Sequence, residues 1–250
     1  MGQEKNIEKN ISGSIFTLIF ILLIAALISA CSLQPQSQPS QSTQEGRAVF
    51  TMTDDAANMD EVTSIKITVN SIKVLNESES WITVSNEQQT YDLLKLKSSG
   101  TQVLLAEYNL TPGTYNQIRL SISQIVVTDA SGDHMAKLPS GELKIVGKLV
   151  INENSTSTVK FDFIADESLH LTGNGTYIFA PVVKLETRQR ANVDLRFREN
   201  VRISDGKIDD DRKEGMDIEG NFGEGYHINE NSRLVIKGDR ITEELNLRGN

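Results

Sequence analysis

The sequence SIKITV at residues 64–69 alternates apolar and polar side chains. Ile65, Ile67 and Val69 fall on one face of an extended chain, while a lysine and a threonine fall on the other. Strict alternation is typical of a strand that packs on one face and meets water on the other. This stretch therefore predicts a half-buried β-strand.

The same period-two pattern recurs in QIRLSIS at residues 117–123 and in TVKFDF at residues 158–163. Several such strands, separated by Gly- and Pro-rich turns, favour an all-β fold. We expect an antiparallel β-sandwich of the transthyretin-like or immunoglobulin-like type. The side chains predicted to point inward are Ile65, Ile67, Val69, Ile118, Leu120, Ile122, Phe161 and Phe163.

Two stretches depart from this simple alternation. Ile72 and Val74 fall out of phase with the preceding strand, so we expect a β-bulge near Asn70 and Ser71 that restores the inward face. DLLKLKSSGTQVLLAEYNL at residues 92–110 fits either a short helix or two edge strands, and the pattern does not separate them.

Composition divides the chain into four parts. Residues 1–30 read as a signal peptide, 31–46 as a flexible Gln/Ser/Pro tether, 47–190 as the sandwich and 191–250 as a polar, hairpin-rich C-terminal extension. The extension contains Asp-Gly and Gly-Asp pairs at positions 205–206 and 238–239, which are typical of two-residue hairpin turns. The acidic, Gly-rich run between these pairs predicts a mobile loop.

Several stretches resemble the domain-of-unknown-function 4382 family, which is found in prokaryotic envelope lipoproteins. The resemblance spans roughly residues 47–188 and implies a β-rich exported domain without a known activity. Its segments are VFTMTDDAANMDEVTSIKITVNSIKVLN (49–76), YDLLKL (91–96), LTPGTYNQIRLSIS (110–123) and YIFAPVVKLETR (177–188). The L-x-P-G-x-Y turn within it also occurs in other sandwich domains and is a packing signature.

The single cysteine, Cys31, follows an almost wholly apolar run at residues 15–30. That run is short for a membrane helix, which needs about 20 residues. Ser29 and Ala30 are small, and together with Cys31 they resemble the lipobox of prokaryotic lipoproteins. The resemblance implies cleavage after Ala30, a lipid on Cys31, and a body held at the cell envelope outside the cytoplasm. An uncleaved anchor helix is the alternative, because two Glu cancel two Lys in the first ten residues.

Charge and cysteine content exclude several classes of protein. The net charge of -9, without a basic stripe, disfavours nucleic acid as a partner. One cysteine cannot form a disulfide framework or a Cys-rich zinc site.

Candidate metal ligands lack a recognisable spacing. His134, His170 and His227 have no partner four residues away, which disfavours a joint metal site. Acidic residues near the C-terminus offer oxygen ligands for calcium, yet their spacing differs from that of an EF-hand loop, and solvated charge is the commoner role. The candidate calcium ligands are Asp209, Asp211 and Asp217, with Asp210 and Glu219 beside them.

Two other features have a functional and a structural interpretation. The pair Asp54-Asp55 could perform acid–base chemistry, but capping or turn roles are commoner for aspartate. Trp81 could stack on a sugar, but it lies in an alternating WITV stretch, which favours the core.

The sequence favours a non-enzymatic binding or structural protein of the envelope. Its partners would be the membrane, through the lipid on Cys31, and another envelope protein or a glycan. No cofactor is expected besides that covalent lipid. The alternatives are a calcium-dependent binding module that uses the acidic extension, and an envelope hydrolase whose site carries no recognisable motif.

Overall fold

The computed structural model describes residues 44–55, 59, 61–229, 232–237 and 240–245. The predicted signal peptide, Ala30, Cys31 and most of the tether therefore lie outside the described residues. Within the described part of the chain, no helix is both long and apolar enough to cross a bilayer.

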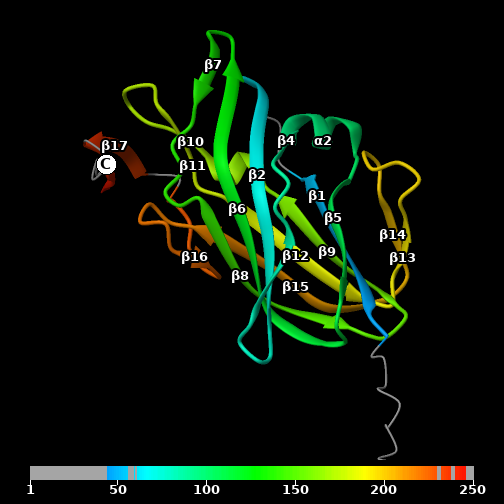
Figure 1. Cartoon of the computed structure of the whole chain (residues 1–250). Helices are drawn as coiled ribbons and strands as arrows, with labels where there is room; N and C mark the ends of the chain where they lie inside the picture. The colour runs from blue at the N-terminus through cyan, green and yellow to red at the C-terminus, as the bar shows by residue number, and fades with distance from the viewer. Residues whose placement is uncertain (1–43, 56–58, 60, 230–231, 238–239, 246–250) are drawn as a thin grey trace, which may run out of the picture. The chain divides into compact units, whose positions relative to one another are not determined.

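Two six-stranded sheets make up most of the described chain (Figure 1). Sheet A contains, in spatial order, β16 (Phe222–Gly223), β15 (Lys207–Met216), β12 (Val182–Gln189), β9 (Thr156–Phe163), β1 (Gly46–Asp54) and β5 (Val103–Leu110). Sheet B contains β3 (Trp81–Ser85), β2 (Val62–Asn76), β6 (Gly113–Asp129) and β7 (Gly132–Met135), with β4 (Gln89–Asp92) on β2 and β8 (Glu142–Ile151) on β6.

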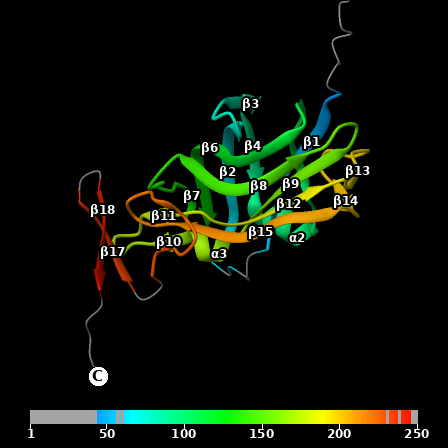
Figure 2. The same ribbon diagram turned by 90° about the horizontal axis from the view of Figure 1, so that it is seen from below.

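The two sheets share one hydrophobic core, as expected for a sandwich. All eight side chains predicted to point inward are buried, with exposed fractions between 0% and 4%. Figure 2 shows β8 of sheet B running alongside β9 and β12 of sheet A, and β8 contacts both strands. The all-β class is confirmed. One strand pair, β1 with β9, is parallel, which alternation within a single strand does not reveal.

The predicted bulge in β2 is confirmed. The register between β2 and β6 shifts between Val69 and Ser71, and Ile72 and Val74 are buried beyond it. The L-x-P-G-x-Y turn passes the chain from sheet A to sheet B. There the hydroxyl of Tyr115 donates to the backbone carbonyl of Thr111 at 2.9 Å, a contact of the tyrosine-corner kind.

The stretch at 92–110 contains one helix and one strand. Helix α2 (Leu93–Ser99) begins at Asp92, whose side chain accepts from the backbone N–H of Lys95. It ends at Gly100, which takes a left-handed conformation with φ 59°. The chain then continues as β5.

The mobile-loop prediction is wrong for the first part of the acidic run. Residues 207–216 form β15, because their backbone pairs with β12 in sheet A. Asp205 and Gly206 do form a turn with positive φ, but the strands that it joins do not pair with each other. β14 (Arg202–Ser204) pairs with β13 (Asn192–Asp194), and β15 pairs with β12.

The later hairpin is present, with β17 (Ser232–Lys237) antiparallel to β18 (Arg240–Leu245). Its predicted turn, Gly238-Asp239, lies outside the described residues. Between β9 and β12 the chain forms a short helix, α3 (Ala165–Ser168), and a two-stranded ribbon of β10 (Leu169–Leu171) and β11 (Tyr177–Phe179).

Candidate functional site

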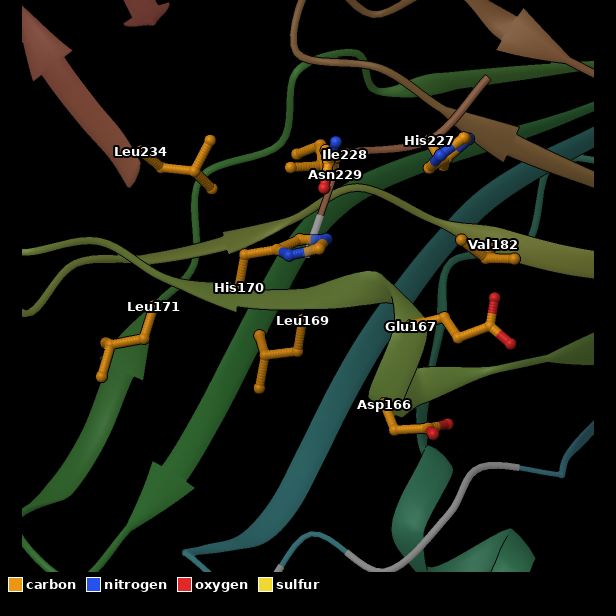
Figure 3. Close-up of a pocket in the computed structure, with 10 residues that line it drawn as sticks. All are labelled: Asp166, Glu167, Leu169, His170, Leu171, Val182, His227, Ile228, Asn229 and Leu234. Atoms are coloured by element: carbon orange, nitrogen blue, oxygen red, sulfur yellow. The ribbon is translucent and has the colours of Figure 1, made fainter. Parts of the chain in front are cut away.

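A pocket of about 360 Å³ opens beside β10, and we call it the β10 pocket (Figure 3). Its lining comes from α3, β10, β12, the loop after β16 and β17. Small-molecule sites in proteins have volumes of this order. The lining residues are Asp166, Glu167, Leu169, His170, Leu171, Val182, His227, Ile228, Asn229 and Leu234.

His170 has an unpaired nitrogen in this pocket. Burial lowers the pKa of the His170 imidazole, which favours its neutral form, while a hydrogen bond to the backbone carbonyl of Glu167 opposes that shift. Its Nε2 is buried and has no hydrogen-bond partner. With the ring hydrogen on Nδ1, where it can donate to that carbonyl, Nε2 presents a lone pair. An unsatisfied buried acceptor costs about 1–3 kcal/mol.

His227 lines the same pocket from a different part of the chain (Figure 3). Its Nδ1 lies 3.1 Å from the carbonyl oxygen of Gly225. With the hydrogen on Nδ1, this contact fixes the ring against its own loop. Spacing along the chain does not indicate that the two histidines line one pocket, because they belong to separate elements.

The carboxylates of the pocket do not converge on the imidazoles. Figure 3 shows the side chains of Asp166 and Glu167 directed away from His170. Glu167 forms an ion pair with Lys213 at 2.6 Å, while Oδ1 of Asp166 is buried without a partner. Among the described residues, no group of three or more His, Cys, Asp or Glu side chains could hold a metal ion.

His134 lies elsewhere, on β7, directly after the turn that joins β6 to β7. Its Nε2 is 3.1 Å from Asp129 Oδ1 and 2.8 Å from the hydroxyl of Ser131. A catalytic Ser-His-Asp triad places the serine and the aspartate on opposite ring nitrogens. Here both contact the same nitrogen, so the group cannot relay a proton from the serine to the histidine in that way.

Asp129 is the centre of this turn. It accepts from the Ser131 hydroxyl at 2.6 Å, the Ser131 backbone N–H at 2.7 Å and the Tyr177 hydroxyl at 2.9 Å. These hydrogen bonds, those of Ser131 foremost, hold the pKa of the Asp129 carboxyl far below its usual range. The arrangement is that of a hydrogen-bonded turn.

The acidic run on β15 has a structural role that its sequence did not reveal. Asp210 Oδ2 accepts from the backbone N–H of Lys148 on β8 at 2.9 Å. Glu214, further along β15, is also buried, and its Oε1 lies 3.9 Å from Nη1 of Arg212. Thr187 donates its hydroxyl to the carbonyl of Lys148 at 2.6 Å. Side chains of sheet A thus satisfy the edge of β8 that has no strand neighbour.

The three candidate calcium ligands have separate partners. Asp209 accepts from the Gln189 side chain at 2.6 Å. Asp211 forms an ion pair with Lys184 at 3.4 Å. Asp217 accepts from the backbone N–H groups of its own turn, at 2.9 and 3.0 Å.

Asp54 has a structural role. Oδ1 of Asp54 accepts from the backbone N–H of Ala165 at 3.1 Å, a capping contact, and burial raises the pKa of its carboxyl to about 7.

The expectation that Trp81 belongs to the core is wrong. Trp81 is 36% exposed, and the guanidinium of Arg119 lies 4.0 Å from its ring centroid. Val84 and Ile82 point inward on β3, so Trp81 falls on the outer face with Thr83.

A family model described as Domain of unknown function (DUF4382) matches residues 45–181. No curated protein matches the chain, and no solved structure does.

Proposed function

Because the chain belongs to the DUF4382 family, whose description names no activity, we propose from its own residues that it is a lipid-anchored envelope protein that binds a glycan in the β10 pocket without transforming it. The anchor is the predicted lipid on Cys31. The sandwich is the binding body. The proposal has a binding half and an anchoring half, and each has its own test.

The unpaired Nε2 of His170 carries the binding half of the proposal. A buried acceptor on a residue that lines a pocket gains a hydrogen bond when a ligand donor reaches it. A ligand hydroxyl or N–H that donates to Nε2 would offset the cost of burying this acceptor without a partner. Asp166, whose Oδ1 is also unpaired, offers a second acceptor on the same lining.

The mixed lining supports a sugar as the donor. Leu169, Leu171 and Leu234 supply apolar surface beside the acceptors. Sugar rings combine hydroxyl donors with apolar C–H faces, so they match such a lining better than a purely apolar or purely charged ligand does. A protein partner would have to place a donor side chain in the same pocket.

The N-terminal sequence supports the anchoring half. The apolar run, the small residues before Cys31 and the Gln/Ser/Pro tether have the order that an anchored protein needs. Strand β1 begins at Gly46, so the folded body starts directly after the tether.

Binding is tested with purified protein on immobilised envelope glycans. We expect His170→Phe, which fills the space but removes the acceptor, to weaken binding by about tenfold. His134→Gln is the matched control, because His134 does not line the pocket. Equal binding by wild type and His170→Phe would contradict the proposal. Capture of an envelope protein, lost in His170→Phe, would replace the glycan with a protein partner.

Anchoring is tested by mass spectrometry of the N-terminus. The mature chain should begin at Cys31 and carry a lipid mass, which Cys31→Ser should remove. A chain that retains Met1 and a free thiol would exclude the lipid anchor and leave the binding test unaffected.

A further inference from the structure

A second cavity, of about 500 Å³, lies between α2 and the loop that joins β13 to β14. We call it the α2 groove. β4 and β5 complete its lining, and it shares no residue with the β10 pocket. Figure 1 shows α2, β5 and the β13–β14 ribbon next to one another on one side of the molecule.

Arg198 lines this groove from a loop with a fixed backbone. The carbonyl of Arg198 accepts from the N–H of Leu104 at 2.8 Å, and the N–H of Val201 donates to the carbonyl of Gln102 at 2.7 Å. Val201 also packs against Val49 and Leu104 in a small apolar cluster. The loop is thus attached to β5, so the backbone of Arg198 is positioned at the groove before any ligand arrives.

Two cations of the groove lack a protein counter-ion. Within the part of the chain that the structure describes, no ion pair engages Arg198 or Lys95, which face the groove from different walls. Arg196, on the same loop as Arg198, is by contrast paired with Asp194 at 2.6 Å. Of the groove's carboxylates, Asp92 is occupied, since it caps α2 and accepts from Ser64 at 2.8 Å. Glu199, the next residue in the sequence, also lines the groove, and its negative charge weakens the attraction of the groove for anions.

Neutral polar groups line one part of the groove, and Leu96, Val103 and Leu104 supply its apolar part. Burial raises the pKa of the Tyr91 phenol to about 12, so it stays protonated and donates to Gln89 at 2.6 Å. The hydroxyls of Ser99 and Thr101 lie 2.7 Å apart on the same lining. Hydroxyls can both donate and accept, which suits a ligand rich in hydroxyl groups.

We propose that the α2 groove binds a carboxylate on a hydroxyl-rich small ligand, an acidic sugar, with the carboxylate between Arg198 and Lys95. A guanidinium presents a planar pair of N–H donors that matches a carboxylate. The hydroxyl lining then contacts the sugar ring. The positive and negative charges that line the groove nearly balance. The affinity therefore depends on the position of the carboxylate between the two cations and not on a net electrostatic attraction.

Calorimetric titration of the purified full chain in detergent tests the proposal with two matched sugars. D-Glucuronate and D-glucose differ only in the carboxylate, and we expect glucuronate to bind about tenfold more tightly. Arg198→Gln should abolish that difference. Arg196→Gln should retain it, because Arg196 is already paired with Asp194. Equal binding of the two sugars, or equal effects of the two substitutions, would overturn the proposal.

Two further measurements test the effect of a negative charge in the groove and the chemical class of the ligand that carries the carboxylate. Glu199→Gln should strengthen glucuronate binding about two- to threefold, since it removes a like charge. Weaker binding in this variant would contradict the placement beside Arg198. An acetylated dipeptide is the second ligand to be titrated. If it binds in place of glucuronate, and Arg198→Gln abolishes its binding, the groove binds a carboxylate, but that of a peptide terminus and not of an acidic sugar.

Discussion

Asp210 and Asp211 are neighbours on β15, yet they occupy opposite environments. The Asp210 side chain is 9% exposed and accepts from the backbone of β8, whereas the Asp211 side chain is 41% exposed and pairs with Lys184 at the surface. Successive residues of a strand point to opposite faces. Position in the strand, and not residue type, therefore decides which carboxylate joins the sheets.

The buried row of β15 replaces a backbone ladder with side chains. Asp210 accepts from β8, and Arg212 lies beside it, with its Nε 2.8 Å from Asp210 and its Nη1 3.9 Å from Glu214. Removing the Asp210 carboxylate would leave the N–H of Lys148 on β8 without its acceptor, and the loss of such a hydrogen bond is costly. The side chains on the outer face of β15, such as Asp211, do not have this role.

The largest difference between the two faces of a strand is expected on β6, where the inner residue is apolar. Leu120 is fully buried, so Leu120→Ala should lower the free energy of unfolding by about 2–5 kcal/mol. Arg119 faces outward and stacks on Trp81, so Arg119→Ala should cost only about 0.5–1 kcal/mol. Chemical denaturation measures both. The reverse ranking would show that the faces are assigned wrongly.

On β15 the same test uses charged residues. Asp210→Ala should cost about 2–4 kcal/mol, because it leaves the N–H of Lys148 without its acceptor and Arg212 without its nearest carboxylate. Asp211→Ala should change stability by less than about 0.5 kcal/mol, since its ion pair is exposed. Similar urea midpoints for the two variants would contradict the expected difference in stability between residues on the inner and outer faces of β15.

Glu214 gives a smaller effect that depends on pH. Burial raises the pKa of its carboxyl from 4.5 to about 7, so the folded state holds a proton that the unfolded state releases between these values. Stability should therefore fall as pH rises through this window. Glu214→Gln should stabilise the protein by about 1–3 kcal/mol near pH 8 and by about zero near pH 4. Melting curves across that range are the measurement, and a constant difference at all pH values would contradict the burial argument.

Calcium should have the smallest effect. Asp209, Asp211 and Asp217 each have their own partners, so we expect millimolar calcium to shift the melting temperature by less than about 1 °C. A larger shift that is lost in the double variant Asp209→Asn/Asp211→Asn would instead support a calcium-dependent binding module.

Much of the fold could be predicted because the core strands obey the period of two. The eight inward residues and the bulge before Ile72 follow from that period alone. Strand β15 could not be found in this way, because its inner face meets the edge of β8, where carboxylates replace apolar side chains. Trp81 was misplaced because an apolar residue at the start of a short edge strand carries little phase information.

The candidate site was less predictable than the fold. His170 and His227 come from β10 and from the loop after β16, and only the folded chain brings them to one pocket. The same holds for Arg198, whose groove is completed by α2 and β5. The cap of α2 could have been recognised, since an aspartate precedes the helix and a glycine follows it.

The parallel pairing of β1 with β9 also constrains how the chain folds. β1 is the first strand among the described residues, yet its parallel partner follows roughly a hundred residues later, and such non-local pairing slows folding. Sheet A then needs β12 and β15, which follow later still. During synthesis, the edge of β1 that later pairs with β9 therefore stays unpaired after β5 has been made, and an unpaired edge favours aggregation.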